Sequence, residues 1–395
     1  MDKKLFLRRG REDSIKRFHP WIFSGAVKNA DSDVNEGDIV TVYSSEGEFL
    51  CKGHYESGSI AVRILSFVDE EIDEQFFKHR ISEAYRMRKK YILPVFAGEE
   101  GSVYRLVHGE GDSLSGLVVD IYGDLAVLQA HSTGMGKSCS LIAKALTEVC
   151  ESVKYVYNKS LSTMPKGKYA VEDGWLSEKR ELPLTVSEYG NLFEINPEDG
   201  QKTGFFIDQR ENRRLLQRYS EGASVLNLFS YTGAFSVYAL KGGAAKVESV
   251  DSSLKAIAQA NRNVEINFGD RASHRGTVAD IFDYLKEAED SYDLIVLDPP
   301  AFAKHRNAVA NALQAYRRLN ARAMEKINPA GGMLFTFSCS QAVDRLQFQQ
   351  AVFSAAAMTG RQASILHCLN QPADHPVSIY HPEGNYLKGL AVYVK

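Results

Sequence analysis

The sequence lacks an apolar run of about 18 residues, so it offers no obvious membrane-spanning helix. Its first residues, MDKKLFLRRGRED, have neither the apolar stretch nor the small-residue cleavage site of a signal peptide. Cysteine is scarce, with 5 residues and no C-x-x-C pair, which argues against a disulfide framework and a structural zinc site. We therefore expect a cytoplasmic protein with reduced thiols, no membrane partner and no bound metal.

A strong positive charge is also absent. The 395 residues carry a net charge of −3, which argues against coating nucleic acid through bulk electrostatics alone. Basic residues nevertheless cluster between Lys3 and Arg17 and again at Arg86, Arg88, Lys89 and Lys90, so local phosphate contacts are an open alternative to a solvated charged face.

The chain is long enough for two or three domains, and its patterns predict three. Residues 1–70 contain the β-type runs GDIVTVYSSEGEFLCKG and SIAVRILSF, separated by glycines, which predict a small β-barrel. Residues 71–180 combine a helical stretch over Asp73–Lys90 with the strand-like runs GLVVDIY, LAVLQAH and KYVYNK and the helical run SLIAKALTEVC, which predict a small α+β domain.

Residues 181–395 begin with a predicted hairpin that turns at Glu188–Gly190 and then alternate apolar strands with amphipathic helices. The predicted strands cover 225–230, 247–251, 292–298 and 331–338, with a weak strand before Asp280 and two late strands at the end. Apolar strands separated by helices indicate a doubly wound α/β domain with a largely parallel sheet. Ligands bind at the carboxyl ends of such strands.

The first of these strands leads into Phe229-Ser230-Tyr231-Thr232-Gly233, a turn with a single glycine. A dinucleotide site would need G-x-G-x-x-G to cradle a pyrophosphate, whereas S-adenosylmethionine has no phosphate and one glycine is enough. The second strand ends at Asp251, whose carboxylate can accept both ribose hydroxyls. Asp280 is either a contact for the adenine amino group or a helix N-cap.

The fourth strand ends in Asp298-Pro299-Pro300-Ala301-Phe302. Two prolines fix an extended turn that presents Asp298 beside the aromatic ring of Phe302, an arrangement suited to a flat base. Similar acidic-Pro-Pro-aromatic turns occur in methyltransferases that act on exocyclic nitrogens, so this motif alone gives a base-methylating class and not the atom.

The fifth strand ends in Thr336-Phe337-Ser338-Cys339-Ser340, which places a cysteine beside that turn. Carbon 5 of a pyrimidine is a poor nucleophile until a thiolate adds to carbon 6, so Cys339 is the candidate nucleophile. Asp298 would hydrogen-bond ring nitrogen 3, where charge develops. The alternative is a small buried structural cysteine, which is how we interpret the other four.

Taken together, the motifs resemble the RlmI family of bacterial 23S rRNA cytosine methyltransferases along nearly the whole chain. The matching stretches are HPWIFSGAV, EGDSLSGLVVDIYGD, DGQKTGFFIDQRENR, VLNLFSYTGAFSVYAL, DPPAF, LFTFSCS and ADHPVSIYHPEGNYLKG. The resemblance implies a PUA domain over 1–70 that binds RNA, a central α+β domain over 71–180, and a Rossmann-like class I methyltransferase domain over 181–395. It also implies S-adenosylmethionine as cofactor and 23S rRNA or a large-subunit precursor as partner.

Carried over by motif, the catalytic residues are Cys339 and Asp298. The cofactor and substrate residues implied by the resemblance and the motifs fall into two sets: for the cofactor Phe229, Tyr231, Gly233, Asp251, Asp280, Asp298 and Gln209, and for the RNA base Phe206, Arg210, Pro299, Pro300 and Phe302. Phe206, Asp208, Gln209 and Arg210 form a strand-like entry to the domain, with an ordered hairpin and a solvated arginine as the alternative.

One departure from related 5-methylcytosine enzymes is Ala301, where many have a second cysteine that assists product release. Proton abstraction from carbon 5 must therefore use another group. Two rival functions stay open: a guanine-nitrogen methyltransferase, against which Cys339 argues, and a non-catalytic RNA-binding assembly factor. The sequence does not define the modified nucleotide, the choice between naked RNA and a ribosomal particle, or the oligomeric state, with which a homodimer is compatible.

Overall fold

The computed structural model describes residues 3–96, 102–165, 167, 169–303 and 305–395, which form two compact units. The first unit comprises Met1–Tyr189, Ile195–Ile207 and Ala373–Gly384, and the second comprises Gly190–Glu194, Asp208–Pro372 and Asn385–Lys395. Three segments of the predicted third domain, 181–189, 195–207 and 373–384, thus belong to the first unit, and the division at residues 70 and 180 stays a prediction. No helix in the described ranges combines the length and apolarity needed to cross a membrane.

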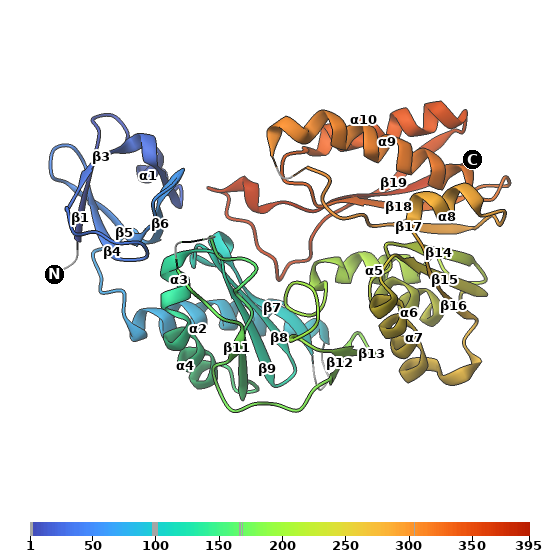
Figure 1. Ribbon diagram of the computed structural model, residues 1–395, viewed down its shortest axis with the longest axis horizontal. Coiled ribbons are helices and arrows are strands. Elements are labelled where there is room, and N and C mark those ends of the chain that lie inside the picture. Colours follow the sequence, from blue (N-terminus) through green and yellow to red (C-terminus); the bar gives the residue numbers. More distant parts are fainter. Residues whose placement is uncertain (1–2, 97–101, 166, 168, 304) are drawn as a thin grey trace. The chain divides into compact units, whose positions relative to one another are not determined.

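The first unit begins with a 6-stranded sheet that curls around an apolar core (Figure 1). Its strands are β1 (Lys3–Leu7), β2 (Trp21–Phe23), β3 (Val27–Ala30), β4 (Ile39–Tyr43), β5 (Phe49–Tyr55) and β6 (Ile60–Ser66), in the order β2-β6-β5-β4-β1-β3, accompanied by the short helix α1 (Asp13–Lys16). Leucine and β-branched side chains at alternate positions of β1, β4 and β6 line this core, among them Leu5, Leu7, Val40, Val42, Val62 and Ile64.

A second sheet of the same unit has 5 strands in the order β11-β10-β9-β8-β7. The strands are β7 (Val103–His108), β8 (Leu117–Tyr122), β9 (Leu125–Ala130), β10 (Tyr155–Asn158) and β11 (Gly174–Trp175), and the helices are α2 (Glu74–Tyr91), α3 (Thr133–Lys137) and α4 (Cys139–Val149). α2 and α4 pack against each other and bury phenylalanine, isoleucine and leucine side chains on the sheet. These elements confirm the strands and helices predicted within 71–180.

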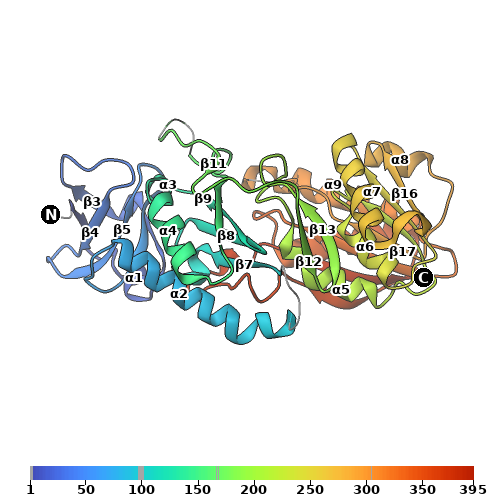
Figure 2. The same cartoon turned by 90° about the horizontal axis from the view of Figure 1, so that it is seen from below.

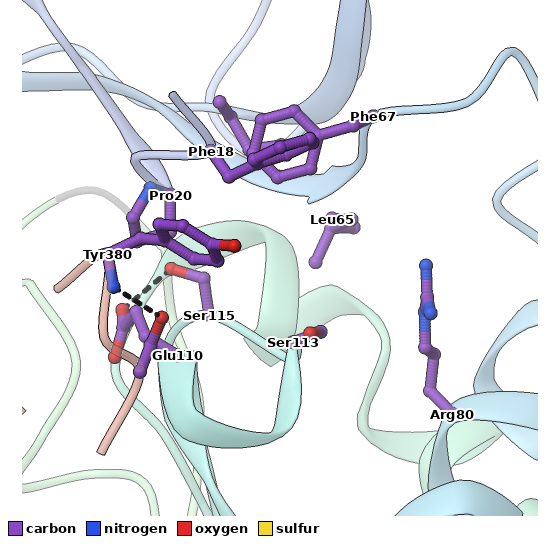
Figure 3. Close-up of a pocket in the computed structure, with 11 residues that line it drawn as sticks. Phe18, Pro20, Leu65, Phe67, Arg80, Glu110, Ser113, Ser115 and Tyr380 are labelled. Atoms are coloured by element: carbon purple, nitrogen blue, oxygen red, sulfur yellow. Dashed lines mark hydrogen bonds between the residues drawn. The ribbon is translucent and has the colours of Figure 1, made fainter. Parts of the chain in front are cut away.

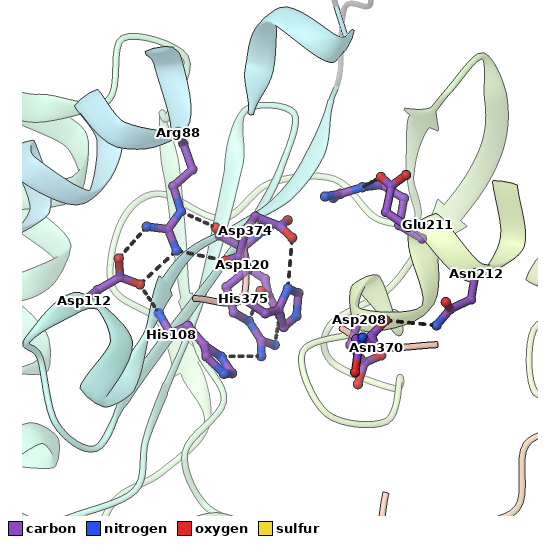
Figure 4. Close-up of polar contacts among 12 residues, drawn as sticks. Arg88, His108, Asp112, Asp120, Asp208, Glu211, Asn212, Asn370, Asp374 and His375 are labelled. Carbon is purple, nitrogen blue, oxygen red and sulfur yellow. Dashed lines mark hydrogen bonds and ion pairs between the residues drawn. The ribbon is translucent and has the colours of Figure 1, made fainter. Parts of the chain in front are cut away.

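Residues Ala373–Gly384 return to the first unit and are held there by a buried polar cluster (Figure 4). Arg88 is fully buried and forms a bidentate ion pair with Asp112, in which Nη2 lies 2.8 Å from Oδ2. The same Nη2 donates to the carbonyl oxygen of Asp374 at 2.8 Å, and the Asp374 carboxylate accepts from the backbone N–H of Arg105 at 2.9 Å. For Arg88, neither alternative open in the sequence, a phosphate contact or a solvated charged face, holds, because its guanidinium is buried and paired with Asp112.

Replacing Arg88 by methionine should destabilise the first unit strongly, since it leaves the buried carboxylate of Asp112 without its cation. Breaking a buried pair by removing one partner costs roughly 3–5 kcal/mol. Both tryptophans, Trp21 and Trp175, lie in this unit, so their fluorescence during guanidinium chloride unfolding reports its stability. The matched control is Lys89→Met, which removes an exposed ion pair with Glu151 and a long cation–π contact with Tyr85 and should hardly move the midpoint. Equal midpoints for the two variants would contradict the assignment.

The hairpin predicted around residue 189 is present as β12 (Leu184–Glu188) and β13 (Asn191–Ile195). Its two turn residues, Tyr189 and Gly190, have φ angles of 50° and 72°. Positive φ at both central residues is the geometry of a type I′ turn, which matches the twist of the adjoining strands. The prediction of a turn at Glu188–Gly190 is confirmed.

The second unit is built on a 7-stranded sheet in the order β16-β15-β14-β17-β18-β20-β19. Its strands are β14 (Ser224–Leu228), β15 (Lys246–Asp251), β16 (His274–Val278), β17 (Leu294–Leu297), β18 (Gly332–Ser338), β19 (Ala363–Leu369) and β20 (Lys388–Val394). Pairing is parallel from β16 to β18, and β20 is antiparallel to both β18 and β19. The predicted doubly wound α/β fold is confirmed, and the two late strands supply its antiparallel edge.

Helices cover both faces of this sheet (Figure 1 and Figure 2). They are α5 (Arg210–Gln217), α6 (Ala234–Lys241), α7 (Leu254–Phe268), α8 (Ile281–Glu287), α9 (Val309–Glu325) and α10 (Arg345–Thr359). α8, α9 and α10 share one apolar core with the sheet, and α5 and α6 share another on the opposite face. Burial of both faces explains why the central strands are apolar throughout.

Candidate active site

Four strand ends of the second unit meet at one edge of its sheet. The strands β15, β14, β17 and β18 are neighbours in that order, and Asp251, Phe229, Asp298 and Cys339 lie at or directly after their carboxyl ends. The strand order reverses between β14 and β17, which makes this edge the topological switch point where doubly wound sheets bind ligands. The structure thus brings together four residues that the sequence singled out.

The turn between β14 and α6 is unusually tight. Phe229, Tyr231 and Gly233 have φ angles of 56°, 46° and 74°, so left-handed residues alternate through it. Non-glycine residues seldom adopt this conformation, and those that do are enriched in tight turns and functional sites. At Gly233 a side chain is also excluded by packing, because a Cβ atom would lie 2.8 Å from the Cβ of Ala260 on α7. The glycine is therefore required by close approach of a helix as well as by its φ angle.

Asp251 orients this turn from the neighbouring strand. Its Oδ2 accepts a hydrogen bond from the backbone N–H of Tyr231 at 2.9 Å, and its Oδ1 accepts from that of Ser253 at 2.9 Å. Each carboxylate oxygen can accept a second hydrogen bond, which suits a pair of ribose hydroxyls. The hydroxyl of Ser230 is buried and has no hydrogen-bond partner among the described residues. An unsatisfied buried hydroxyl between these residues fits a polar ligand in the turn.

Asp280 is the N-cap of α8 in the structure. Its Oδ1 accepts from the backbone N–H groups of Phe282 and Asp283 at 2.8 and 3.2 Å. Both bonds end on the same oxygen and the residue is exposed, so the cap leaves Oδ2 able to accept from a ligand. The N-cap alternative is confirmed, and the adenine contact stays a prediction.

The segment around Gln209 differs from its predicted conformation. Residues Ile207–Gln209 form a 3-10 turn that leads directly into α5, so the expected strand-like entry is wrong. In the helix that follows, the side chains of Arg210 and Asn212 are buried. Arg210 is therefore not the solvated arginine of the alternative interpretation.

Within this helix entry, Gln209 contacts the candidate catalytic carboxylate. Its Nε2 donates to Oδ2 of Asp298 at 3.0 Å, and its Oε1 accepts from Nδ2 of Asn212 at 2.6 Å. The amide is thus fixed with its nitrogen towards Asp298 and positions that carboxylate. Phe206 belongs to the first unit, where the ammonium of Lys202 lies 4.4 Å from the centre of its ring.

The turn after Asp298 is tied to the loop that carries Cys339. The backbone N–H of Ala303 donates to Oγ of Ser340 at 3.2 Å. The hydroxyl of Tyr316 on α9 lies 2.9 Å from Oγ of both Ser338 and Ser340, and its ring packs 4.8 Å from that of Phe302. These contacts hold the half-buried Cys339 between two fixed serines. Of the two prolines in the turn, Pro299 is buried and Pro300 is exposed.

Lys388 lies beside Cys339 and was missed in the sequence. It is paired with Ser338 across β18 and β20, is buried, and donates from Nζ to the carbonyl oxygen of Ser340 at 2.8 Å. Burial lowers its pKa to about 8, and the nearby charge of Cys339 partly offsets that effect. A lysine inside the apolar run LKGLAVYV (387–394) was the available signal, because lysine is rarely buried without a partner.

Comparisons with known proteins agree with this architecture. Residues 5–67 match the PUA-like domain, and residues 159–377 match the S-adenosylmethionine-dependent methyltransferases. The chain is 37% identical over 398 residues to ribosomal RNA large subunit methyltransferase I of Pseudoalteromonas translucida, covering 99% of each protein. It is 36% identical over 394 residues to the protein of that name from Aeromonas salmonicida, covering 98% of each.

A crystal structure described as a methyltransferase complexed with S-adenosylhomocysteine superposes on the chain with a TM-score of 0.84. The two proteins are 25% identical, and the superposition covers 100% of both chains. Together these matches confirm the predicted fold class and the predicted cofactor, S-adenosylmethionine.

Proposed function

Since the chain belongs to the ribosomal RNA large subunit methyltransferase I family, we propose that it methylates carbon 5 of a cytosine in 23S rRNA through a covalent adduct with Cys339. The observation that carries the proposal is the setting of this thiol. Cys339 is half-buried beside the cation of Lys388, and its loop is bonded to the turn that follows Asp298. A purely structural cysteine needs neither a buried cation nor an adjacent carboxylate.

The methyl donor would lie along the first two strand ends. Asp251 would bind the ribose hydroxyls, the turn at Phe229, Tyr231 and Gly233 would enclose the amino-acid end with the hydroxyl of Ser230 as a further contact, and Asp280 would accept from the adenine amino group. The bound cofactor supplies a methyl group on a positively charged sulfur.

Catalysis would begin with addition of the Cys339 thiolate to carbon 6 of the base. A sulfur–carbon bond forms, the double-bond electrons pass into the ring, and a proton shared between Asp298 and nitrogen 3 neutralises the resulting charge. Carbon 5 then takes the methyl group. Loss of the carbon-5 proton restores the double bond as the sulfur–carbon bond breaks, which returns the thiolate.

Lys388 would stabilise the thiolate before it attacks. With a pKa of about 8 it is mostly an ammonium ion at neutral pH, and a neighbouring cation favours the thiolate over the thiol. Gln209 would position Asp298. The base would be held by Pro299, Pro300 and Phe302, with Phe206 and Arg210 as further substrate contacts.

The proposal also assigns a role to each of the three predicted domains. Residues 1–70 would bind RNA, residues 71–180 would form the central domain, and residues 181–395 would carry catalysis. The substrate implies action in the cytoplasm.

Trapping the covalent adduct tests the proposed atom. Incubating the enzyme and S-adenosylmethionine with 23S rRNA fragments that contain 5-fluorocytosine should give a complex that survives denaturant, because fluorine cannot leave carbon 5 as a proton does. The complex should be absent with Cys339→Ser, and peptide mass mapping should find the nucleotide on Cys339. If the RNA is methylated without any such complex, the rival guanine-nitrogen activity gains support.

A further inference from the structure

A cavity of about 320 Å³ lies within the first unit (Figure 3). Three segments distant in sequence supply its walls: the N-terminal sheet region contributes Phe18 and Phe67, the central region contributes Arg80 and Glu110, and the returning segment contributes Tyr380. The volume lies at the small end of the range for ligand pockets. No residue of the proposed methyl-transfer centre lines it.

Three aromatic rings converge on this space. The ring of Phe18 lies 5.2 Å from that of Phe67, edge to face, and 5.4 Å from that of Tyr380. Phe18 and Tyr380 are 50% and 47% exposed, so part of each ring surface is accessible to a ligand. Aromatic side chains that stay accessible beside polar groups provide the stacking surfaces on which proteins bind unpaired bases.

The backbone of the cavity is strained at two places. Phe18 and Ser113 both line it, and both have left-handed φ angles, 62° and 58°. Residues other than glycine keep this conformation only where the surroundings impose it, and such residues cluster at ligand sites. Two such residues, from two different walls of one cavity, indicate a cavity shaped for a ligand.

Polar groups of the cavity can form hydrogen bonds with the edge of a base. Glu110 accepts from Nε1 of Trp21 at 2.8 Å and from Oγ of Ser115 at 2.7 Å, and both bonds end on Oε1. Burial raises the pKa of Glu110, but these hydrogen bonds and the charge of Arg63 outweigh it, so the net pKa lies below its ordinary value and the carboxylate is ionised. An ionised carboxylate accepts from amino and imino groups of a base.

The guanidinium of Arg80 adds a cationic hydrogen-bond donor to the cavity. Nε of Arg80 is buried and lacks a hydrogen-bond partner among the described residues, although its terminal nitrogens contact Glu70 and Glu83. A donor left unsatisfied in a wall of the cavity would gain a bond from an acceptor on a ligand, such as a base carbonyl.

The geometry points to a second nucleobase site: the cavity binds one unpaired base of the RNA, stacked on Tyr380 beside the tilted ring of Phe18, with its edge towards Glu110 and Arg80. It would hold the RNA by a base other than the cytosine that is methylated. This inference rests on the proposed RNA substrate and not on the chemistry at Cys339. An aromatic peptide is the competing occupant, but the ionised Glu110 and the donor of Arg80 match the mixed edge of a base better.

Trp21 provides a direct test, since its indole is bonded to two residues of the cavity. In the full-length Trp175→Phe protein, Trp21 is the sole tryptophan. A short single-stranded oligoadenylate should change its fluorescence saturably, and the same chain made of abasic nucleotides should bind much more weakly. Tyr380→Ala should weaken oligoadenylate binding by about fivefold to a hundredfold.

Two control variants separate stacking from general damage. Tyr380→Phe keeps the ring and should bind within about twofold of the parent, since stacking needs only the aromatic face. Tyr91→Ala removes a ring that is 63% exposed and does not line the cavity, and it should bind like the parent. Because Tyr380 is half-exposed, its replacement should leave the unfolding midpoint unchanged.

Three outcomes would overturn the inference: equal binding of the abasic chain, normal binding by Tyr380→Ala, or a saturable response to an unstructured aromatic peptide and none to the oligoadenylate. Methylation of 23S rRNA is measured separately in the same preparations. Methylation without base binding in the cavity refutes only this inference, whereas base binding without methylation by the parent protein refutes the proposed function.

Discussion

Replacing Cys339 by alanine should abolish methyl transfer to RNA while leaving S-adenosylmethionine binding nearly unchanged. Without the thiolate, carbon 5 of the pyrimidine has no route to nucleophilic character, so we expect a loss of about 10³-fold or more in the rate. Alanine fills less space than cysteine but sits at a half-buried loop, so little stability should be lost. Transfer of a radioactive methyl group to rRNA and calorimetric titration with the cofactor measure the two properties.

The matched control for this variant is Cys368→Ala. Cys368 lies on β19 of the same unit and is exposed, with no contact to the four strand ends that the structure describes. Its replacement should leave the rate unchanged. Full activity of Cys339→Ala would exclude the covalent mechanism, and loss of cofactor binding in that variant would show that the cysteine supports the fold of the pocket instead.

Replacing Lys388 by methionine should lower the rate by about 10²–10³-fold, the usual effect of removing one group that stabilises charge in a water-poor site. Methionine keeps much of the side-chain volume but not the cation. Lys388→Arg should restore part of the rate, because it keeps the charge but adds bulk in a buried position. Activity alone would not separate this role from the hydrogen bond that Lys388 donates to Ser340.

Alkylation of Cys339 by iodoacetamide at different pH values separates the two roles, since only the thiolate reacts. The folded pKa of Lys388, about 8, lies below the ordinary lysine value, so its cation is present below that pH and is lost as the pH rises through it. In the parent protein Cys339 should therefore react at lower pH than in Lys388→Met. Cys368, mapped in the same digests, is the internal control and should show one profile in both. An unchanged Cys339 profile would leave Lys388 only a structural role.

Most of the second unit could be predicted from the sequence because its strands are apolar on both faces and are separated by amphipathic helices. That pattern predicts the strand ends at Phe229, Asp251, Asp298 and Cys339. Hairpin and capping chemistry is equally local, as the turn at Tyr189-Gly190 and the cap at Asp280 show. Local sequence is informative wherever neighbours along the chain decide the conformation.

The residues whose surroundings the sequence does not predict correctly have partners that are distant in sequence. Arg88 belongs to a basic cluster in the sequence, and only the fold shows that Asp112 and the segment at Asp374 enclose it. The strand-like entry expected at residues 206–210 is instead a 3-10 turn that leads into α5, and the buried polar side chains of that helix give the sequence no apolar periodicity to indicate it. Charged residues in the interior depend on pairing, which composition does not reveal.

The sequence by itself determined the class of the enzyme, its cofactor and the candidate nucleophile, because motifs at strand ends keep their spacing along the chain. Only the tertiary structure decided what surrounds them. In the fold, Lys388 of the last strand lies beside Cys339, and Gln209 donates a hydrogen bond to Asp298. The cavity of the first unit is lined by three segments that are distant in sequence. The physical reason is that charge, burial and strain depend on neighbours in space, and those neighbours are set by strand order rather than by position in the chain.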